Sequence, residues 1–273
     1  MKNDVLIVGK GYIGEKLQKA WGCAITDRWI ASYADLLDEV KKHKAKVVIN
    51  CIGYTGARNV DDCEKDIDAT ITANTIVPIW FGELAFREPV KVVHISSGCI
   101  YDYDYASQPP IEENLTPAYY KLFYSRTKIY AEAVLEPLSR RCNILITRIR
   151  VPLDDKPSPR NLIDKLIRYK KVIDVPNSVT YLPDFVKAMG HLIDIDARGI
   201  YNVVAKGPLV YPKMMDLYKT YCPSFAYEVL PIKDLGLNRT NLVLSVSKLE
   251  KTGFKVRTIE EILDECIRNY TKS

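Results

Sequence analysis

The first half of the chain alternates short apolar runs with longer segments whose apolar residues recur at helical spacing. The apolar runs predict five strands, at residues 4–9, 23–27, 46–53, 90–97 and 143–150. The periodic segments between them predict helical structure, at residues 12–21, 34–43, 61–86 and 124–138. This alternation is typical of a parallel sheet covered by helices, so we expect an α/β fold with a doubly wound, Rossmann-type sheet.

The second half of the chain is less regular. A short apolar run at 199–205 predicts one more strand of the same sheet, and the charged, proline-rich stretch 152–161 predicts a crossing between two lobes. Helical spacing returns at 161–172, 183–195 and 258–270. We therefore expect a Rossmann domain over 1–152 and 178–206, with a small interleaved C-terminal substrate lobe over 153–177 and 207–273.

Composition narrows the class of protein. The chain has 273 residues, and no apolar run approaches the roughly 18 residues that span a membrane. Its N-terminus enters the first strand without a signal-peptide pattern, which favours a cytoplasmic enzyme with no membrane partner. The net charge of +5 mildly favours anionic small molecules but is too small and dispersed to indicate nucleic acid. The histidines His43, His94 and His191 lack ligand spacing, so no metal site is expected.

A glycine motif directly follows the first predicted strand and opens a helix. In VLIVGKGYIGEKL, Gly9, Gly11 and Gly14 form GxGxxG, with Tyr12 and Ile13 between the last two glycines. The glycines permit a tight turn, close approach of a pyrophosphate and packing of the helix on the strand. We therefore expect these five residues to bind a dinucleotide.

The next strands supply candidates for the rest of that cofactor. Asp27 ends the second strand, where a carboxylate can hold a ribose hydroxyl, whereas its neighbour Arg28 can pair with a 2′-phosphate. Arg28 favours NADPH, with NADH as the alternative. Cys51 and Gly53 end the third strand, where the adenine half usually lies, and Asn74 follows at a position that often supports such sites.

A second motif predicts the chemistry. In YSRTK, Tyr124 and Lys128 are four residues apart in a predicted helix, so both side chains lie on one face. An adjacent ammonium stabilises a phenolate, so Tyr124 can protonate the alkoxide that forms when hydride reaches a carbonyl carbon. Ser97, at the end of the preceding strand, can donate a hydrogen bond to the carbonyl oxygen.

At this point the chain resembles an extended short-chain dehydrogenase/reductase, and more closely the nucleotide-rhamnose synthase (3,5-epimerase/4-reductase) family. That family also supplies the C-terminal half of plant rhamnose synthases. The resemblance rests on the blocks NCIGYTGARNVDDCE, SSGCIYDYD, FYSRTK, NLIDKLIRYKKVIDVPNS and RTNLVLSVSKL, between residues 50 and 249. It implies conversion of UDP-4-dehydro-6-deoxy-D-glucose to UDP-L-rhamnose with NADPH, functional coupling to a separate 4,6-dehydratase and, as one option, a homodimer.

The resemblance also assigns two residues to epimerisation. SGCIY is similar to the arrangement in GDP-fucose synthase and puts Cys99 at the position of the epimerisation cysteine, while Lys165 matches the lysine of the rhamnose synthases. Without the resemblance, Lys165 is a solvated charge on an amphipathic helix. The alternative for Cys99 is a small buried thiol, but its offset from Ser97 favours catalysis. With the resemblance, the pair would remove and return protons at C3 and C5 of the sugar.

Five further residues are candidates for contact with the nucleotide sugar: Thr55, Arg58, Asn59, Asn161 and Arg239. Two departures bear on the substrate. Gly98 stands where dTDP-4-dehydrorhamnose reductases often carry an acidic residue, which argues against reduction alone. Cys51, Ile52 and Tyr54 replace commoner small residues, so the choice between UDP and dTDP stays open. The alternatives are a dTDP-4-dehydrorhamnose reductase and a non-catalytic NADP-binding regulatory subunit.

Overall fold

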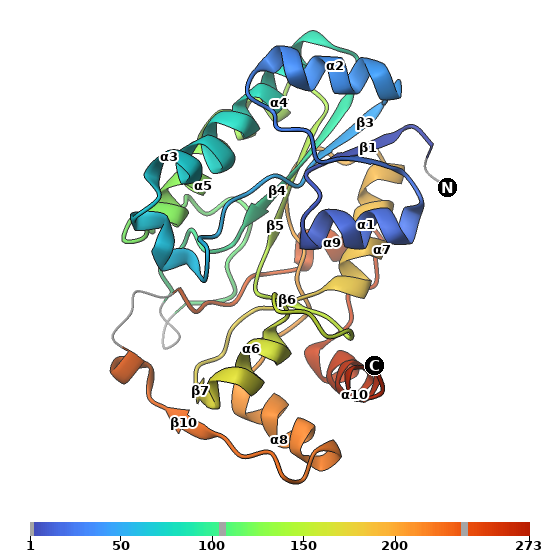
Figure 1. The fold of residues 1–273 in the computed structure, drawn as a ribbon. Helices are drawn as coiled ribbons and strands as arrows, with labels where there is room; N and C mark the ends of the chain where they lie inside the picture. Colours follow the sequence, from blue (N-terminus) through green and yellow to red (C-terminus); the bar gives the residue numbers. More distant parts are fainter. Residues whose placement is uncertain (1–2, 104–107, 236–239) are drawn as a thin grey trace. The chain divides into compact units, whose positions relative to one another are not determined.

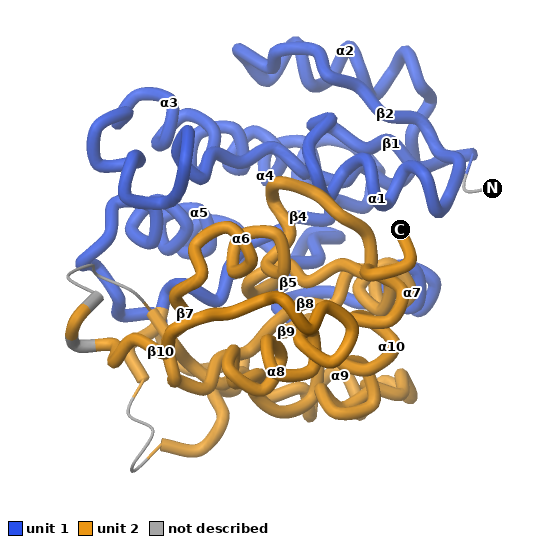
Figure 2. Tube along the Cα trace, turned by 60° about the horizontal axis from the view of Figure 1, so that its bottom comes forward, with its two compact units in different colours: residues 1–100, 117–148, 190–201 blue, residues 101–116, 149–189, 202–273 orange. Residues whose placement is uncertain are grey.

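The computed structural model describes residues 3–103, 108–235 and 240–273 (Figure 1). The chain forms two compact units, shown in different colours in Figure 2. Unit 1 comprises residues 1–100, 117–148 and 190–201, and unit 2 comprises residues 101–116, 149–189 and 202–273. None of the helices within the described ranges is long and apolar enough to cross a membrane.

A six-stranded sheet organises unit 1. Its strands lie in the order β2-β1-β3-β4-β5-β9. Their bounds are β1 Val5–Val8, β2 Ala24–Thr26, β3 Val47–Asn50, β4 Lys91–Ser97, β5 Ile144–Ile149 and β9 Gly199–Asn202. β1 runs parallel to β2 and β3, and β3 runs parallel to β4. The predicted doubly wound, Rossmann-like sheet is therefore confirmed, including the late strand at 199–205. In this order the connections change direction between β1 and β3, which is where such sheets bind ligands.

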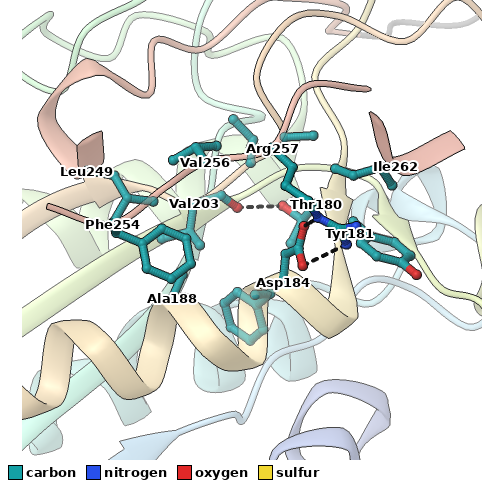
Figure 3. Close-up of a pocket in the computed structure, with 13 residues that line it drawn as sticks. Thr180, Tyr181, Asp184, Ala188, Val203, Leu249, Phe254, Val256, Arg257 and Ile262 are labelled. Carbon is teal, nitrogen blue, oxygen red and sulfur yellow. Dashed lines mark hydrogen bonds and ion pairs between the residues drawn. The ribbon is translucent and has the colours of Figure 1, made fainter. Parts of the chain in front are cut away.

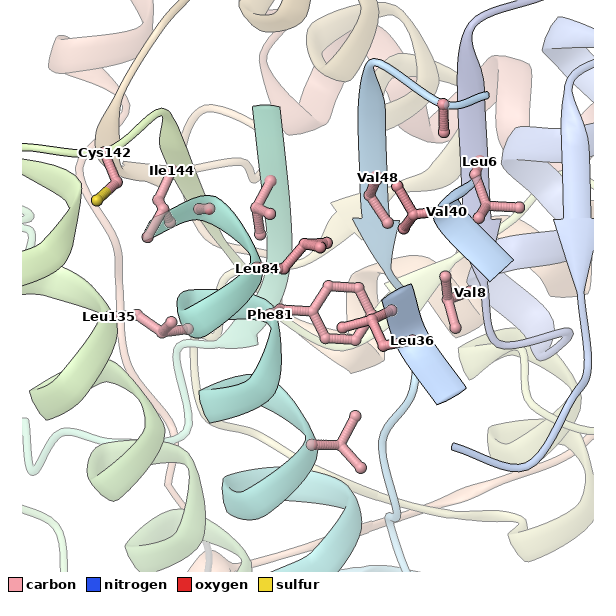
Figure 4. Close-up of a cluster of buried hydrophobic side chains, with 14 of the residues drawn as sticks. Leu6, Val8, Leu36, Val40, Val48, Phe81, Leu84, Leu135, Cys142 and Ile144 are labelled. Atoms are coloured by element: carbon pink, nitrogen blue, oxygen red, sulfur yellow. The ribbon is translucent and has the colours of Figure 1, made fainter. Parts of the chain in front are cut away.

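Helices cover this sheet, and all of them except the first pack into one apolar core. They are α1 Tyr12–Trp21, α2 Tyr33–His43, α4 Val77–Arg87 and α5 Phe123–Ser139. Figure 4 shows part of the core, in which Phe81 and Leu84 of α4 lie among side chains of β1, β3, α2 and β5. β1 has the sequence VLIV and is buried along its whole length, as expected for a strand covered on both faces.

The predicted helical segment 61–86 is not one helix. It consists of η1 Val60–Glu64, α3 Ile67–Ile71, a wide π-type turn η2 over Thr72–Ile76, and α4. In the wide turn the Val77 N–H bonds to the Thr72 carbonyl, five residues back, and Pro78, which follows, has no N–H to donate to the carbonyl of residue 74. The turn contains Asn74, one of the predicted cofactor residues.

Unit 2 has an apolar core of its own, to which short strands and helices contribute. Two small sheets pair β6 Pro152–Leu153 with β8 Thr180–Tyr181, and β7 Lys171–Ile173 with β10 Glu228–Leu230. Its helical elements are α6 Leu162–Tyr169, most of α7 Leu182–Asp194, α8 Tyr211–Tyr221, η3 Ile232–Leu235, α9 Ser247–Glu250 and α10 Ile259–Thr271. The amphipathic stretch predicted at 161–172 ends as a helix at Tyr169, because Lys170 takes a left-handed conformation before β7 begins.

Candidate active site

The glycine loop joins β1 to α1 at the switch between β1 and β3. Gly9 has a φ of 109°, and a Cβ there would lie 2.8 Å from the backbone nitrogen of Ile52. A Cβ on Gly14 would lie 2.2 Å from the carbonyl oxygen of Gly9. Packing therefore requires a glycine at both positions.

Gly11 is different, because a Cβ there would meet no atom of the described residues within 4 Å. Gly11 is also the N-cap of α1, and among those residues no side chain caps the helix there. Internal packing thus does not explain the missing side chain at Gly11. The open space above an uncapped helix N-terminus fits the pyrophosphate of a dinucleotide.

The loop after β3 is fixed by two buried asparagines. Asn50 accepts a hydrogen bond from the Ile52 N–H at 2.9 Å. Asn74 binds both backbone groups of Tyr54, accepting from its N–H at 2.9 Å and donating to its carbonyl at 2.8 Å. A Cβ on Gly53 would lie 3.5 Å from Asn74 Oδ1 and 3.6 Å from Lys128 Nζ, so the loop passes close to the proposed reduction site. Burial raises the pKa of the Cys51 thiol, which keeps it neutral at this loop.

The structure gives Arg28 acidic partners. Its guanidinium lies 2.7 Å from Asp35 and 3.5 Å from Glu39, both on α2, with Asp38 at 3.9 Å. Asp27 is exposed beside it. A 2′-phosphate would therefore have to share Arg28 with these carboxylates, which weakens the preference that the sequence indicates for NADPH.

Ser97 and Cys99 belong to one turn at the end of β4. Ser97 is buried, and its Oγ accepts a hydrogen bond from the backbone N–H of Cys99 at 3.1 Å. As an acceptor in this bond, the hydroxyl keeps its own hydrogen for donation to another group. The same bond fixes the backbone of Cys99, whose side chain is half-buried, relative to Ser97.

Helix α5 carries the other two predicted catalytic residues. Tyr124 and Lys128 lie on its buried face, with 8% and 4% of their surfaces exposed. Burial lowers the pKa of Lys128 from 10.5 to about 8, and the charge of Glu132 partly opposes that change. Cys63 and Cys99 also act on Lys128 electrostatically. The Lys128 ammonium is therefore charged at neutral pH but can lose its proton near pH 8.

A contact that the sequence does not reveal fixes the start of α5. Glu64 of η1 accepts hydrogen bonds from the Phe123 N–H and from Arg126. A carboxylate at this position satisfies a backbone donor of the first helical turn and interacts favourably with the helix dipole. The loop that carries the predicted substrate residues is thereby tied to the helix that carries Tyr124.

The predicted substrate residues of that loop are exposed, as contact with a ligand requires. Two of them also have local partners: Arg58 forms an ion pair with Asp62, and Asn59 caps η1 by accepting from the Asp61 N–H. Thr55 lies on the same loop.

In unit 2, Asn161 is fully buried, and its amide serves structure. It accepts from the backbone N–H groups of Asp154 and Ile163 and donates to the carbonyls of Asp154 and Lys156. A substrate contact would have to replace these bonds, so we omit Asn161 from the proposed site. Lys165 of α6 is half-buried, and burial together with Arg160 and Arg168 lowers the pKa of its ammonium. Arg239 lies outside the described residues.

Unit 2 also contains a small, mostly apolar hollow (Figure 3). Its polar side chains bind protein groups: Arg257 donates to Asp184 at 2.7 Å and 2.8 Å, and Thr180 donates to the Val203 carbonyl. Arg257 also donates to Glu265. These pairings stabilise unit 2 and leave the hollow without the convergent polar groups of a binding site.

Comparison with known proteins places this geometry in a family. The model of the NAD dependent epimerase/dehydratase family matches residues 5–203. The chain belongs to that family. The match covers the glycine loop, the turn at Ser97 and the start of α5, and it supports a nicotinamide cofactor at this site.

Two curated relatives come from Arabidopsis thaliana. A bifunctional dTDP-4-dehydrorhamnose 3,5-epimerase/dTDP-4-dehydrorhamnose reductase is 29% identical over 95% of this chain and 91% of its own. A trifunctional UDP-glucose 4,6-dehydratase/UDP-4-keto-6-deoxy-D-glucose 3,5-epimerase/UDP-4-keto-L-rhamnose-reductase is 30% identical over 84% of this chain, which matches only 36% of that longer protein. The predicted likeness to plant rhamnose synthases is confirmed.

Solved structures agree on the fold. A UDP-rhamnose synthase from Acanthamoeba polyphaga mimivirus superposes with a TM-score of 0.89 at 20% identity, over 97% of this chain and 99% of that one. A dTDP-4-dehydrorhamnose reductase from Bacillus anthracis in complex with NADP has a TM-score of 0.81 at 21% identity, over 97% and 98%. The family match and the curated relatives together support an NAD(P)-dependent nucleotide-sugar epimerase/reductase.

Proposed function

We propose that this chain converts UDP-4-dehydro-6-deoxy-D-glucose to UDP-L-rhamnose, inverting C3 and C5 and then reducing C4 with NADPH. The observation that carries the proposal is the turn after β4, where one hydrogen bond joins the Ser97 hydroxyl to the backbone of Cys99. A reductase needs the serine but has no use for a thiol beside it. The bifunctional plant relative, matched over almost its whole length, supports the same combination.

For the reduction, Gly9, Gly11 and Gly14 would hold a nicotinamide cofactor, which would supply a hydride for C4. Ser97 donates a hydrogen bond to the C4 oxygen and so stabilises the negative charge that develops there. Tyr124 gives its phenolic proton to that oxygen, and the Lys128 ammonium stabilises the resulting phenolate. The burial of Tyr124 and Lys128 strengthens the attraction between their charges, because little water screens it.

For the epimerisation, the C4 ketone acidifies the C–H bonds at C3 and C5. Inversion needs a base on one face of the carbon and an acid on the other, and we assign the base to Cys99 and the acid to Lys165. Repeating this exchange at the second carbon leaves the ketone intact and both centres inverted. The lowered pKa of Lys165 makes its ammonium a better acid than an ordinary lysine.

The proposal also covers the cofactor, the residues that contact the substrate, the cellular location and the oligomeric state. Arg28 would bind the 2′-phosphate of NADPH while sharing its charge with Asp35, with NADH as the alternative cofactor. Thr55, Arg58 and Asn59 would meet the sugar, and Arg239 the diphosphate. We place the enzyme in the cytoplasm, supplied by a separate 4,6-dehydratase, and we propose a homodimer.

The test is incubation of the purified chain with UDP-4-dehydro-6-deoxy-D-glucose and NADPH, with the product identified by proton NMR. Formation of UDP-L-rhamnose, with one NADPH oxidised per molecule, supports the proposal. If the chain turns over dTDP-4-dehydrorhamnose but not the UDP sugar, the proposed function is wrong and the chain is a dTDP-4-dehydrorhamnose reductase. If the chain binds NADPH but turns over neither sugar, the proposed function is wrong and the chain is a non-catalytic, NADP-binding regulatory subunit.

A further inference from the structure

A buried ion pair lies directly beneath the catalytic face of α5. Glu132 receives three hydrogen-bond contacts from the Arg148 guanidinium of β5, at 2.6, 3.0 and 3.1 Å. It also accepts a hydrogen bond from Ser96 of β4 at 2.5 Å. All three side chains are buried, with 3% or less of each residue exposed. The pair therefore holds α5 against two neighbouring strands at a place that water does not reach.

Strand β4 and helix α5 also carry residues of the proposed reduction site. Ser96 directly precedes Ser97, and Glu132 follows Lys128 by four residues, which puts the two side chains on one face of α5. A shift of α5 would therefore alter both the contact at Ser96 and the place of Lys128.

Glu132 is the carboxylate that stabilises the charge of Lys128. The other titratable groups that interact with Lys128 come from elements packed on α5: Cys63 of η1, Cys99 after β4 and His94 of β4. His94 is buried, and its pKa is held well below 6.5, so it adds no charge at neutral pH. Tyr124 lies one turn before Lys128 on the same helix.

We propose that Glu132 is a positioning residue of the reduction site: anchored by Ser96 and Arg148, it fixes α5 and holds a negative charge one helical turn from Lys128. The inference rests on the proposed function only in taking Lys128 as the partner of Tyr124 in catalysis. The electrostatic effect of Glu132 on Lys128 is a property of the folded chain and can be measured with no substrate.

The experiment measures the protonation of Lys128 directly. The chain is labelled with ¹³C at the lysine Cε, and its NMR signals are followed from pH 6 to 11, a range of about five units chosen to bracket the ordinary lysine value. The Lys128 signal is identified by its loss in Lys128→Met. The test variant is Glu132→Gln, which keeps the shape of the side chain and one acceptor oxygen but removes the charge.

The matched control is Glu136→Gln. Glu136 lies one turn further along α5 and pairs with Arg140, but its side chain is 38% exposed. We expect Glu132→Gln to lower the pKa of Lys128 by about one unit or more, and Glu136→Gln to leave it unchanged. In an enzyme that reduces the keto sugar, the fall of kcat/KM at high pH should move by the same amount.

Glu132→Gln leaves Arg148 as a buried, unpaired cation, which endangers folding. The double variant Glu132→Gln/Arg148→Gln avoids this, because neither charge remains, and it should lower the pKa of Lys128 as well. A Lys128 that titrates at the wild-type pH in a folded Glu132 variant overturns the proposal. So does an equal shift in Glu136→Gln. Absence of sugar turnover in the wild type would refute the proposed function without affecting either result.

Discussion

Replacing Lys128 by methionine should stabilise the fold at neutral pH while it removes the catalytic ammonium. Burial lowers the pKa of Lys128 from 10.5 to about 8, so the folded chain holds this proton less tightly than the unfolded chain does. Below pH 8 both states are charged, and the folded state bears the full cost of the buried charge. Between the two pKa values only the unfolded state keeps the proton, so the free energy of unfolding of the wild type rises with pH.

The size of the effect follows from the same two pKa values. Their difference, at about 1.36 kcal/mol for each unit, corresponds to about 3 kcal/mol. Little discount for solvent screening applies, because only 4% of Lys128 is exposed. We therefore expect Lys128→Met to be more stable than the wild type by up to about 3 kcal/mol at pH 7. The gain should shrink steadily from pH 8 to 10.5 and then disappear.

The assay is urea unfolding of both proteins at several pH values, with Lys206→Met as the control. Lys206 is exposed and pairs with Glu250, so its replacement should change the free energy of unfolding by less than about 0.5 kcal/mol. A Lys128→Met variant that is less stable than the wild type at pH 7 would refute the reasoning. A gain of equal size at pH 7 and pH 10 would refute it too.

Three further changes test other parts of the site. Asp35→Asn releases Arg28 from its nearest carboxylate and should lower the KM for NADPH about fivefold, with little change for NADH, in steady-state kinetics. Tyr124→Phe removes the proton donor and should lower kcat for reduction about a hundredfold or more, while NADPH affinity measured by fluorescence stays within about twofold. Glu64→Ala removes the acceptor for the Phe123 N–H and should cost about 1 kcal/mol in urea unfolding.

Local signals in the sequence were sufficient to predict much of unit 1. Helix α1 spans the predicted residues 12–21, because Gly11 precedes it and Gly22, in a left-handed conformation, ends it. The strands match because each is a short run rich in apolar residues, as the VLIV of β1 is between Asp4 and Gly9. The turn at Ser97 follows from its position at the end of such a run.

Other features depend on contacts between residues far apart in the sequence. The acceptor for the first turn of α5 is Glu64, 59 residues before Phe123, and no local pattern indicates that pairing. The sequence makes Asn161 a candidate for contact with the nucleotide sugar, but burial commits its amide to backbone groups. Arg148 does carry a local signal: an arginine inside a buried strand requires a buried carboxylate, and Glu132 provides it.

The central claim is that one chain both epimerises and reduces, and deuterium exchange tests it most directly. UDP-4-dehydro-6-deoxy-D-glucose is incubated in D₂O with the wild type or with Cys99→Ala, without reduced cofactor, and followed by proton NMR. We predict that the wild type introduces deuterium at C3 and C5 and that Cys99→Ala introduces none. Subsequent addition of NADPH to the wild type should yield UDP-L-rhamnose. Reduction without exchange, or exchange that persists in Cys99→Ala, would contradict the account.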